Sequence, residues 1–259
     1  MHLPATNMNE PVLSLSSAPI VEAVLDIECD MPPAIEIASL ESHARDLFLD
    51  QYPKFRTQFV QEHEIKQESG ASPKMSVRQG IQALQFLQDD EKQLVQVRAE
   101  GFSFNRLAPY SSLDDYLSEI KRTWRLFVGL ALPVQIRLIR LRYINRILLP
   151  LTNGRVELDD YLKLGPRLPD EDRLTFAGFL NQHSAVEADT GNRVNIVLTT
   201  QPPEQGMLPL IFDIEAASTG NGEPSDWPWI LSRIQSLRSL KNRIFRNTLT
   251  EQCLKLFQR

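Results

Sequence analysis

Residues 134–150, VQIRLIRLRYINRILLP, combine β-branched and aromatic side chains with a series of arginines. From Ile136 onward the apolar and basic residues nearly alternate, which predicts a strand with one buried face and one basic face. The alternation slips at 139–141, so we expect a bulge or bend there. A helix is the competing interpretation, but the β-branched content and the closing Pro150 favour a strand.

The composition is that of an ordinary folded protein. The chain has 259 residues, of which 42% are apolar and 24% charged, enough for a sizeable core in one large or two small domains. The net charge of −5 argues against extended nucleic-acid binding, because that affinity comes mostly from clustered lysines and arginines. A local basic strip is still compatible with binding a phosphate.

The two cysteines, Cys29 and Cys253, are far apart in the sequence and lack any CxxC neighbourhood. A disulfide scaffold or a structural zinc site is therefore not expected. The N-terminal residues do not have the pattern of a signal peptide, and no apolar run reaches the roughly 18 residues that would span a bilayer. We expect a soluble, cytoplasmic protein without membrane contact.

The first part of the chain predicts a flexible segment at 1–17 and an α+β half at 18–132. The expected strands are 18–28, 55–67, 81–88, 93–99 and 102–107, with a polar loop at 68–80. The expected helices are 34–50 and 113–130, the second capped by Ser111 or Ser112. The long strand at 134–150 follows.

We expect the second half, 133–259, to repeat this pattern and to form one structural unit with the first. It predicts a short helix at 156–164, strands at 175–186, 194–200 and 208–216, a loop at 217–226 and a basic helix at 227–257. We therefore expect an α+β fold, a duplicated strand-helix-strands-helix pattern with antiparallel sheets packed against helices and a long C-terminal helix. This order resembles the saddle-shaped fold of the TATA-binding protein and helix-grip folds.

Several stretches together carry a family resemblance. They are APIVEAVLDI at 18–27, VQVRAEGFSFNRLAPY at 95–110, LRYINRILLP at 141–150, DDYL at 159–162, FDIEA at 212–216 and LRSLKNRIFRNTLTEQCLKLF at 237–257. Their order and spacing resemble an uncharacterised, sporadically distributed bacterial and archaeal family of similar length. The resemblance implies an intracellular protein of a single architecture, with the scattered distribution of mobile or defence-associated genes. It implies no catalytic residues.

Polar residues within these stretches are the candidate ligand or partner-binding residues. They are Arg98, Asn105, Arg106, Tyr110, Arg142, Tyr143, Asn145, Arg146, Lys241 and Asn242. In one interpretation they pair with one another and with the acidic strand residues Glu22, Asp26, Asp213 and Glu215, because polar groups in apolar strands need partners. In the other they form a basic pocket for a phosphate, a nucleotide or an acidic peptide.

The same four acidic residues are the set available to a metal-dependent nuclease, although no motif fixes their spacing. The histidines are scattered, and the motifs GxSxG, GxxxxGK[ST] and GxGxxG are absent. We therefore expect no catalytic or metal-ligating residues and no cofactor.

The leading hypothesis is a non-enzymatic interaction protein that binds a protein partner. It would act as an accessory, sensor or antitoxin-like component of a prokaryotic defence or toxin–antitoxin system. The basic C-terminal helix and the loop at 226–229 are candidate contact surfaces, although Trp227 and Trp229 are also suited to packing the helix start. The alternatives are a protein that binds a small anionic ligand or nucleotide and a divergent metal-dependent nuclease. The oligomeric state is left open.

Overall fold

The computed structural model describes residues 15, 17–33, 35–66, 74–170, 173–174 and 176–258, with the side chains of 61–66 and 74–79 excepted. The predicted flexible segment 1–17 therefore lies almost entirely outside the described residues. The strands are β1 (Ile20–Asp30), β2 (Lys54–Lys66), β3 (Lys74–Leu87), β4 (Gln93–Arg98), β5 (Gly101–Leu107), β6 (Gln135–Pro150), β7 (Leu180–Val186), β8 (Arg193–Thr200) and β9 (Met207–Gly222). The α-helices are α1 (Glu41–Phe48), α2 (Leu113–Ala131), α3 (Trp227–Thr248) and α4 (Glu251–Lys255), and the 3-10 helices are η1 (Ile37–Leu40) and η2 (Leu158–Asp160).

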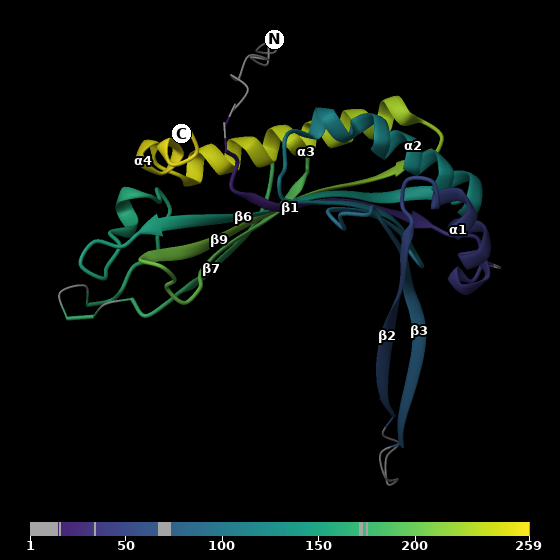
Figure 1. Cartoon of the computed structure of the whole chain (residues 1–259), viewed down its shortest axis with the longest axis horizontal. Helices are drawn as coiled ribbons and strands as arrows, with labels where there is room; N and C mark the ends of the chain where they lie inside the picture. Colours follow the sequence, from purple (N-terminus) through teal and green to yellow (C-terminus); the bar gives the residue numbers. More distant parts are fainter. Residues whose placement is uncertain are drawn as a thin grey trace.

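The nine strands of the described residues form one antiparallel sheet, in the order β2-β3-β4-β5-β1-β6-β9-β8-β7. The expected α+β class is confirmed. Strands β1 and β6, which begin the two predicted halves, pair with each other near the middle of the sheet. Helices α2 and α3 lie side by side over one face, and the sheet curves away from them towards both ends (Figure 1).

The stretch at 134–150 forms β6, the predicted strand. Leu141 and Tyr143 are buried beneath the helices, whereas Arg140 and Arg142 alternate with them on the other face. The predicted bulge at 139–141 is wrong, since the register shifts between Ile136 and Leu138 instead. Ile136 and Ile139 are both fully buried, although an odd spacing puts side chains on opposite faces of a regular strand. Against β1, Glu28 pairs with Leu138 and Cys29 with Ile136, so Arg137 is one extra residue in β6, and this bulge puts Ile136 and Ile139 on the same face.

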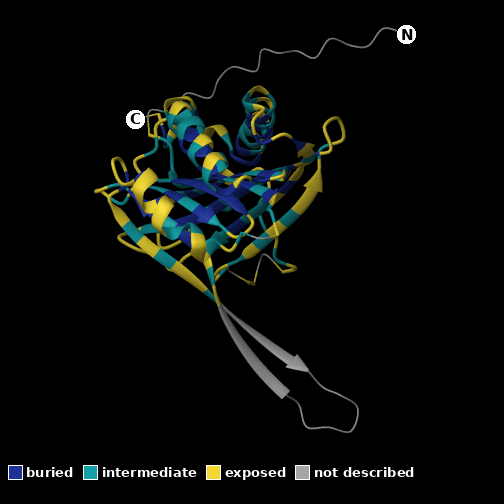
Figure 2. Ribbon diagram, turned by 90° about the vertical axis from the view of Figure 1, so that its right-hand side faces the viewer, coloured by how far each residue is buried: buried dark blue, intermediate teal, exposed yellow. Residues whose placement is uncertain are grey.

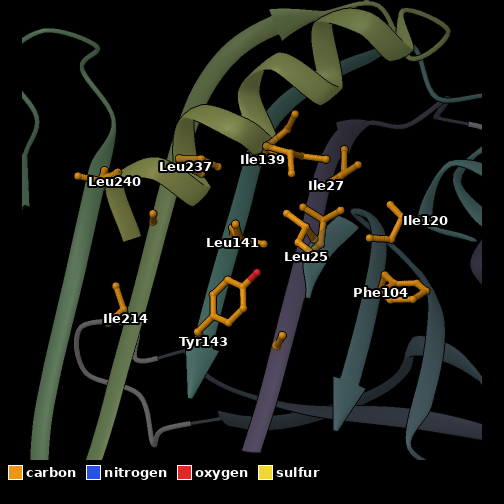
Figure 3. Packing of buried hydrophobic residues seen from close by; sticks show 14 of the residues in the cluster. Leu25, Ile27, Phe104, Ile120, Ile139, Leu141, Tyr143, Ile214, Leu237 and Leu240 are labelled. Carbon is orange, nitrogen blue, oxygen red and sulfur yellow. The ribbon is translucent and has the colours of Figure 1, made fainter. Parts of the chain in front are cut away.

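The core lies between the helices and the sheet. Buried residues concentrate in the strands beneath the helices, and the rim of the sheet is exposed (Figure 2). On α2, the rings of Trp124 and Phe127 contact Phe102 of β5 at centroid distances of 5.6 and 5.7 Å. On α3, Leu237 and Leu240 lie above the sheet residues that Figure 3 labels. The apolar faces of the two predicted helices thus make the core.

Helix α2 starts as the sequence predicts, because the side chain of Ser112 accepts a hydrogen bond from the Asp115 amide. The predicted single helix at 227–257 is wrong. Helix α3 ends at Thr248, and Leu249 is extended and fully buried. Thr250 then caps α4 by accepting from the Cys253 amide at 3.2 Å. No helix within the described part of the chain has both the length and the apolar composition needed to cross a membrane.

Two predicted loops are shorter than expected. Residues 74–80 belong to β3, which pairs with β2 from Lys74 to Leu87 but with β4 only over Ala83–Leu87. The outer part of this hairpin is a two-stranded ribbon, in which β3 pairs with β2 alone among the described strands. Likewise, 217–222 extend β9, where the small residues around Gly222 receive the ring of Trp229.

Three predicted elements are longer than the observed ones. The helix at 34–50 reduces to η1 and α1, and the helix at 156–164 reduces to the 3-10 turn η2. The strand at 175–186 begins only at Leu180, and Thr175 lies outside the described residues.

Gly101 is required at the tight connection between β4 and β5. Its φ is +144°, and an added Cβ would lie 2.0 Å from the carbonyl oxygen of Ile27. Any side chain would push β5 away from β1, so glycine at this position fixes the pairing on which the centre of the sheet depends.

Candidate functional site

The ten candidate residues are divided between the two faces of the sheet. Arg98, Asn105, Arg142 and Arg146 project from the face that no described helix covers, which we call the open face. Arg106, Tyr110, Tyr143 and Lys241 lie on the helix side. Neighbours along a strand point to opposite faces, so Arg142 and Tyr143 cannot share one pocket.

A row of polar side chains crosses the open face from β4 to β7, and we call it the long ladder. It consists of Arg98, Ser103, Asp26, Arg140, Glu215, Asn195 and Ser184. The strands β4, β5, β1, β6, β9, β8 and β7, which are neighbours in the sheet, contribute one residue each. The sheet order therefore builds a continuous polar row from residues scattered over the whole sequence.

Asp26 is the most heavily contacted carboxylate of the long ladder. It accepts hydrogen bonds from Arg98 Nη1 at 2.9 Å and from the Ser103 hydroxyl. Arg140 Nη1 lies 3.7 Å from the second oxygen of Asp26, and Arg140 Nη2 donates to the Glu28 carboxylate at 3.1 Å. Only 14% of the Asp26 side chain is exposed. The ladder is thus ordered and partly dehydrated despite lying on an uncovered face.

A second row, the glutamine ladder, runs from β2 to β1. It consists of Gln58, Gln85, Gln96, Asn105 and Glu22, joined by hydrogen bonds of 2.8 to 3.1 Å. Asn105 donates to the Glu22 carboxylate, and its own oxygen accepts from Gln96. Together the two ladders draw a side chain from each of the nine strands.

The remaining open-face candidates are also paired. Arg142 donates from Nε to both oxygens of Asp213 at 3.0 Å and from Nη2 to one of them at 2.5 Å. Arg146 binds Glu204 at 2.5 Å and Gln201 at 3.3 Å. Asp213 stabilises the charge of Arg142 by hydrogen bonding, which raises the guanidinium pKa. The interpretation that the candidate residues pair with acidic strand residues is confirmed for Arg98, Asn105 and Arg142.

On the helix side, aromatic and basic residues form a second group, which we call the aromatic–basic cluster. It consists of Arg106, Tyr110, Tyr116, Tyr143 and Lys241. The hydroxyls of Tyr110 and Tyr143 are 3.0 Å apart, and Lys241 Nζ lies 3.9 Å from the centroid of the Tyr143 ring. Figure 3 shows the Tyr143 ring among the apolar residues of the core.

Burial shifts the pKa values in this cluster. Loss of hydration lowers the pKa of Lys241 to about 7, and the nearby positive charge of Arg238 acts in the same direction. Loss of hydration also raises the pKa of Tyr143 to about 12 and that of Tyr110 further. Both hydroxyls are therefore neutral hydrogen-bonding groups at physiological pH, while Lys241 titrates close to it.

Arg106 lies at the other end of the cluster, 5.4 Å from the ring centroid of Tyr116. Its Nε is buried, and no described residue accepts a hydrogen bond from it. A cavity of about 10 Å³ adjoins Arg106, Tyr110 and Tyr143. That volume fits about one water molecule.

The last two candidates lie apart from both groups. Asn145 is buried within β6 and donates to the backbone carbonyls of Tyr143 and Phe212, so it serves the strand pairing. Asn242 is half-buried on α3.

The sequence interpretation omitted Arg140, at the centre of the long ladder, and Asp114 and Arg238, which join α2 to α3 at 2.8 and 2.9 Å. Arg140 is two residues before Arg142 in the same alternating strand. The alternation alone therefore predicts that both arginines lie on the same face.

The predicted contact surfaces are largely engaged within the molecule. Arg233 stacks on Trp229, Arg238 binds Asp114, and Arg243 binds Glu187. The basic C-terminal helix stays a candidate contact surface, with these three arginines already engaged in contacts within the molecule. Trp227 and Trp229 pack against the core at the helix start, where Asp226 caps α3.

The four acidic residues considered for a metal are held by other side chains. Within the described residues, no group of three or more His, Cys, Asp and Glu side chains is arranged to hold a metal ion. Asn105 binds Glu22, and arginines bind or lie close to the other three.

A separate cavity of about 340 Å³ opens between the segment after β6 and the ends of β8 and β9. Its lining includes Arg155, Glu157, Phe176 and Phe179. None of the ten candidate residues lines it.

Comparison of the sequence with protein-family models and with curated proteins finds no match. The functional argument therefore rests on the geometry of the open face and of the aromatic–basic cluster.

Proposed function

We propose that this protein is a non-enzymatic interaction protein that binds a partner protein on the open face of its sheet. The observation that supports the proposal most strongly is the pair of polar ladders, which cover the width of the sheet without a described helix above them. Hydrogen-bonded side chains fixed on strands make a surface that is ordered before a partner arrives.

The charge pattern of the open face favours a polypeptide partner. Asp26, Glu28 and Asp213 alternate with arginines that bind them, so neither sign dominates. A nucleic acid would require an excess of positive charge, whereas a protein surface with its own mixed charges can match an alternating pattern and be selected by it.

The preorganisation of the arginines supports binding as well. Association normally costs side-chain entropy, about 0.5–1.5 kcal/mol for each long side chain that becomes immobile. Arg98 and Arg140 are already held by carboxylates, with 24% and 25% of their side chains exposed. A partner that contacts them pays little of this cost.

The cellular setting rests on the sequence resemblance described above. It supports a cytoplasmic accessory, sensor or antitoxin-like component of a prokaryotic defence or toxin–antitoxin system. We also propose that the two halves are a duplicated unit. In support, the first strand of each half pairs with its last strand, β1 with β5 and β6 with β9.

The experiment compares two exposed arginines on opposite sides of the molecule. Arg193 lies on the open face in β8, and Arg125 lies on α2. Tagged wild type, Arg193→Glu and Arg125→Glu are used to capture proteins from the native host. The proposal expects a specific partner that is retained by wild type and Arg125→Glu and is depleted with Arg193→Glu. Recovery of no specific protein at any salt concentration, or equal loss with both variants, would refute it.

A second candidate function is binding of a small anionic ligand at the aromatic–basic cluster. The observation that favours it is the buried Nε of Arg106, which lacks an acceptor among the described residues. An anion at the adjoining cavity would supply that acceptor. Because the cavity fits about one water molecule, the probe is chloride, a monatomic anion. Thermal stabilisation by chloride that is lost in Arg106→Gln but kept in Arg193→Gln would support this function. The same stabilisation in both variants would exclude it.

A further inference from the structure

Within the described residues, strand β7 forms one edge of the sheet and pairs with β8 alone. The Glu187 amide donates to the Asn192 carbonyl, and the Phe179 carbonyl accepts from the Thr200 amide. The odd-numbered residues of 179–187 therefore point their N–H and C=O groups towards β8. The N–H and C=O groups of Leu180, Gln182, Ser184 and Val186 therefore point away from the sheet. This edge has the donors and acceptors for one more strand.

The composition of β7 does not protect this edge. The strand LNQHSAV has no Lys, Arg, Asp, Glu or Pro, the residues with which proteins commonly block an edge strand. The opposite edge, β2, begins with Lys54 and Arg56, both ion-paired with Glu91. The nearest charged residue after β7, Glu187, is itself bound by Arg243. Strand β2 thus contains charged side chains, whereas β7 contains none.

Strand β7 is complementary to itself in one antiparallel register. With His183 opposite His183 of a second copy, Leu180 falls opposite Val186, and Gln182 falls opposite Ser184. Leu180 and Val186 are 69% and 64% exposed, and both point to the open face. Each apolar side chain would cover the other across the new strand pair.

The centre of this register carries an independent signal. His183 Nε2 is buried and has no hydrogen-bond partner among the described residues. Because His183 points its backbone groups towards β8, its pairing with the second copy is of the non-hydrogen-bonded kind, with Cα atoms about 4.5 Å apart. The two imidazoles would thus lie opposite each other on the helix side of the joined sheet.

We infer that the protein forms a homodimer in which the β7 strands of two copies pair antiparallel about His183. The two sheets join into one continuous sheet, and the two open faces lie on the same side of it. This inference does not rest on the proposed partner binding, since it uses the edge of the sheet and not its ladders.

The test is the mass of the purified full-length chain in solution, by sedimentation or light scattering, across the micromolar range. Wild type is expected at twice the mass of one chain. Val186→Lys places an ammonium opposite Leu180 and is expected to be a monomer. Val134→Lys is the matched control, because Val134 is also 64% exposed but precedes β6. It is expected to remain a dimer. Monomeric wild type, or dimeric Val186→Lys, would overturn the inference.

Three further variants test whether the loss of the dimer comes from misfolding and whether the strands pair in this register. Ser184→Pro removes an outward N–H and leaves the bonds to β8 intact, so it should yield a folded monomer. Under oxidation, His183→Cys should form a covalent dimer, whereas Leu180→Cys should not, since its two copies would lie about 20 Å apart. The reverse cross-linking pattern, or a dimer of Ser184→Pro, would contradict this pairing.

Discussion

Arg142 and Asp213 form a diagonal ion pair across β6 and β9. Arg142 lies directly opposite Glu215 in the register, and Asp213 lies opposite Ile144. The guanidinium nevertheless binds both oxygens of Asp213. Arg140 reaches diagonally in the same direction, towards Glu215 at 3.6 Å. The arginines of β6 are thus bound by acids of its neighbours, so they are ordered parts of the open face.

This diagonal pair can be measured with Arg142→Ala, Asp213→Ala and the double variant. Because 42% of the Arg142 side chain is exposed, solvent screens the pair, and we expect a coupling energy of about 0.5–1 kcal/mol. Urea denaturation of the three variants and wild type gives the value. A coupling energy near zero would show that the pair does not order the face.

Asp26 should matter more to stability than an exposed acid with a similar partner. Asp26→Ala leaves Arg98 and Arg140 partly buried without their shared carboxylate, and we expect a loss of about 2–3 kcal/mol in the free energy of unfolding. Glu204→Ala, in which 48% of the wild-type side chain is exposed, should cost less than about 1 kcal/mol. Equal losses of unfolding free energy by chemical denaturation would contradict the expectation that the more buried carboxylate contributes more.

Lys241 should destabilise the fold at low pH. Its folded pKa of about 7 lies below the ordinary 10.5, so folding disfavours its charged form. The penalty is complete below pH 7, decreases as the pH rises from 7 towards 10.5, and vanishes above it. Lys241→Met should therefore raise the melting temperature more at pH 6 than at pH 9. The control is Lys121→Met, since Lys121 also lies near an aromatic ring, 5.9 Å from the Trp227 centroid. An equal pH dependence in both variants would contradict this account.

Two glycines should respond to alanine with opposite signs. An added Cβ at Gly222 would lie 2.2 Å from the Trp229 ring, so Gly222→Ala must displace the ring and should cost at least about 1–3 kcal/mol. Gly129 lies inside α2 with nothing within 4 Å of an added Cβ, so Gly129→Ala should stabilise by about 0.5–1 kcal/mol. Thermal melting with tryptophan fluorescence distinguishes them. An unshifted emission spectrum in Gly222→Ala would contradict the packing.

The sequence predicted the elements that bury an apolar face. Strand β6 and helix α2 follow the expected ranges closely because their periodicity reflects burial on one side. The outer part of β3 was not predicted, since a two-stranded ribbon is held by backbone pairing and carries little periodic signal. The end of α3 was missed for a different reason. Leu249 continues the apolar pattern, but its burial against Leu162 requires an extended backbone.

The candidate residues were found, but their grouping was not. The sequence placed Arg142 and Tyr143 in one cluster because they are adjacent, whereas strand alternation puts them on opposite faces. The ladders also depend on the order of nine strands, which no local pattern encodes. Ser103 and Gln96 thus become parts of continuous polar rows only when the sheet is assembled.

The most direct test of the proposed function blocks each side of the molecule with a bulky thiol-reactive label. Thr219→Cys places the label on the open face, and Gly129→Cys places it on α2, where both positions are exposed. The native Cys29 and Cys253 are buried and do not compete. Binding of the captured partner is then measured by calorimetry. The account predicts that the label at position 219 abolishes binding and that the label at position 129 does not. Unchanged binding with the label at position 219 would contradict it.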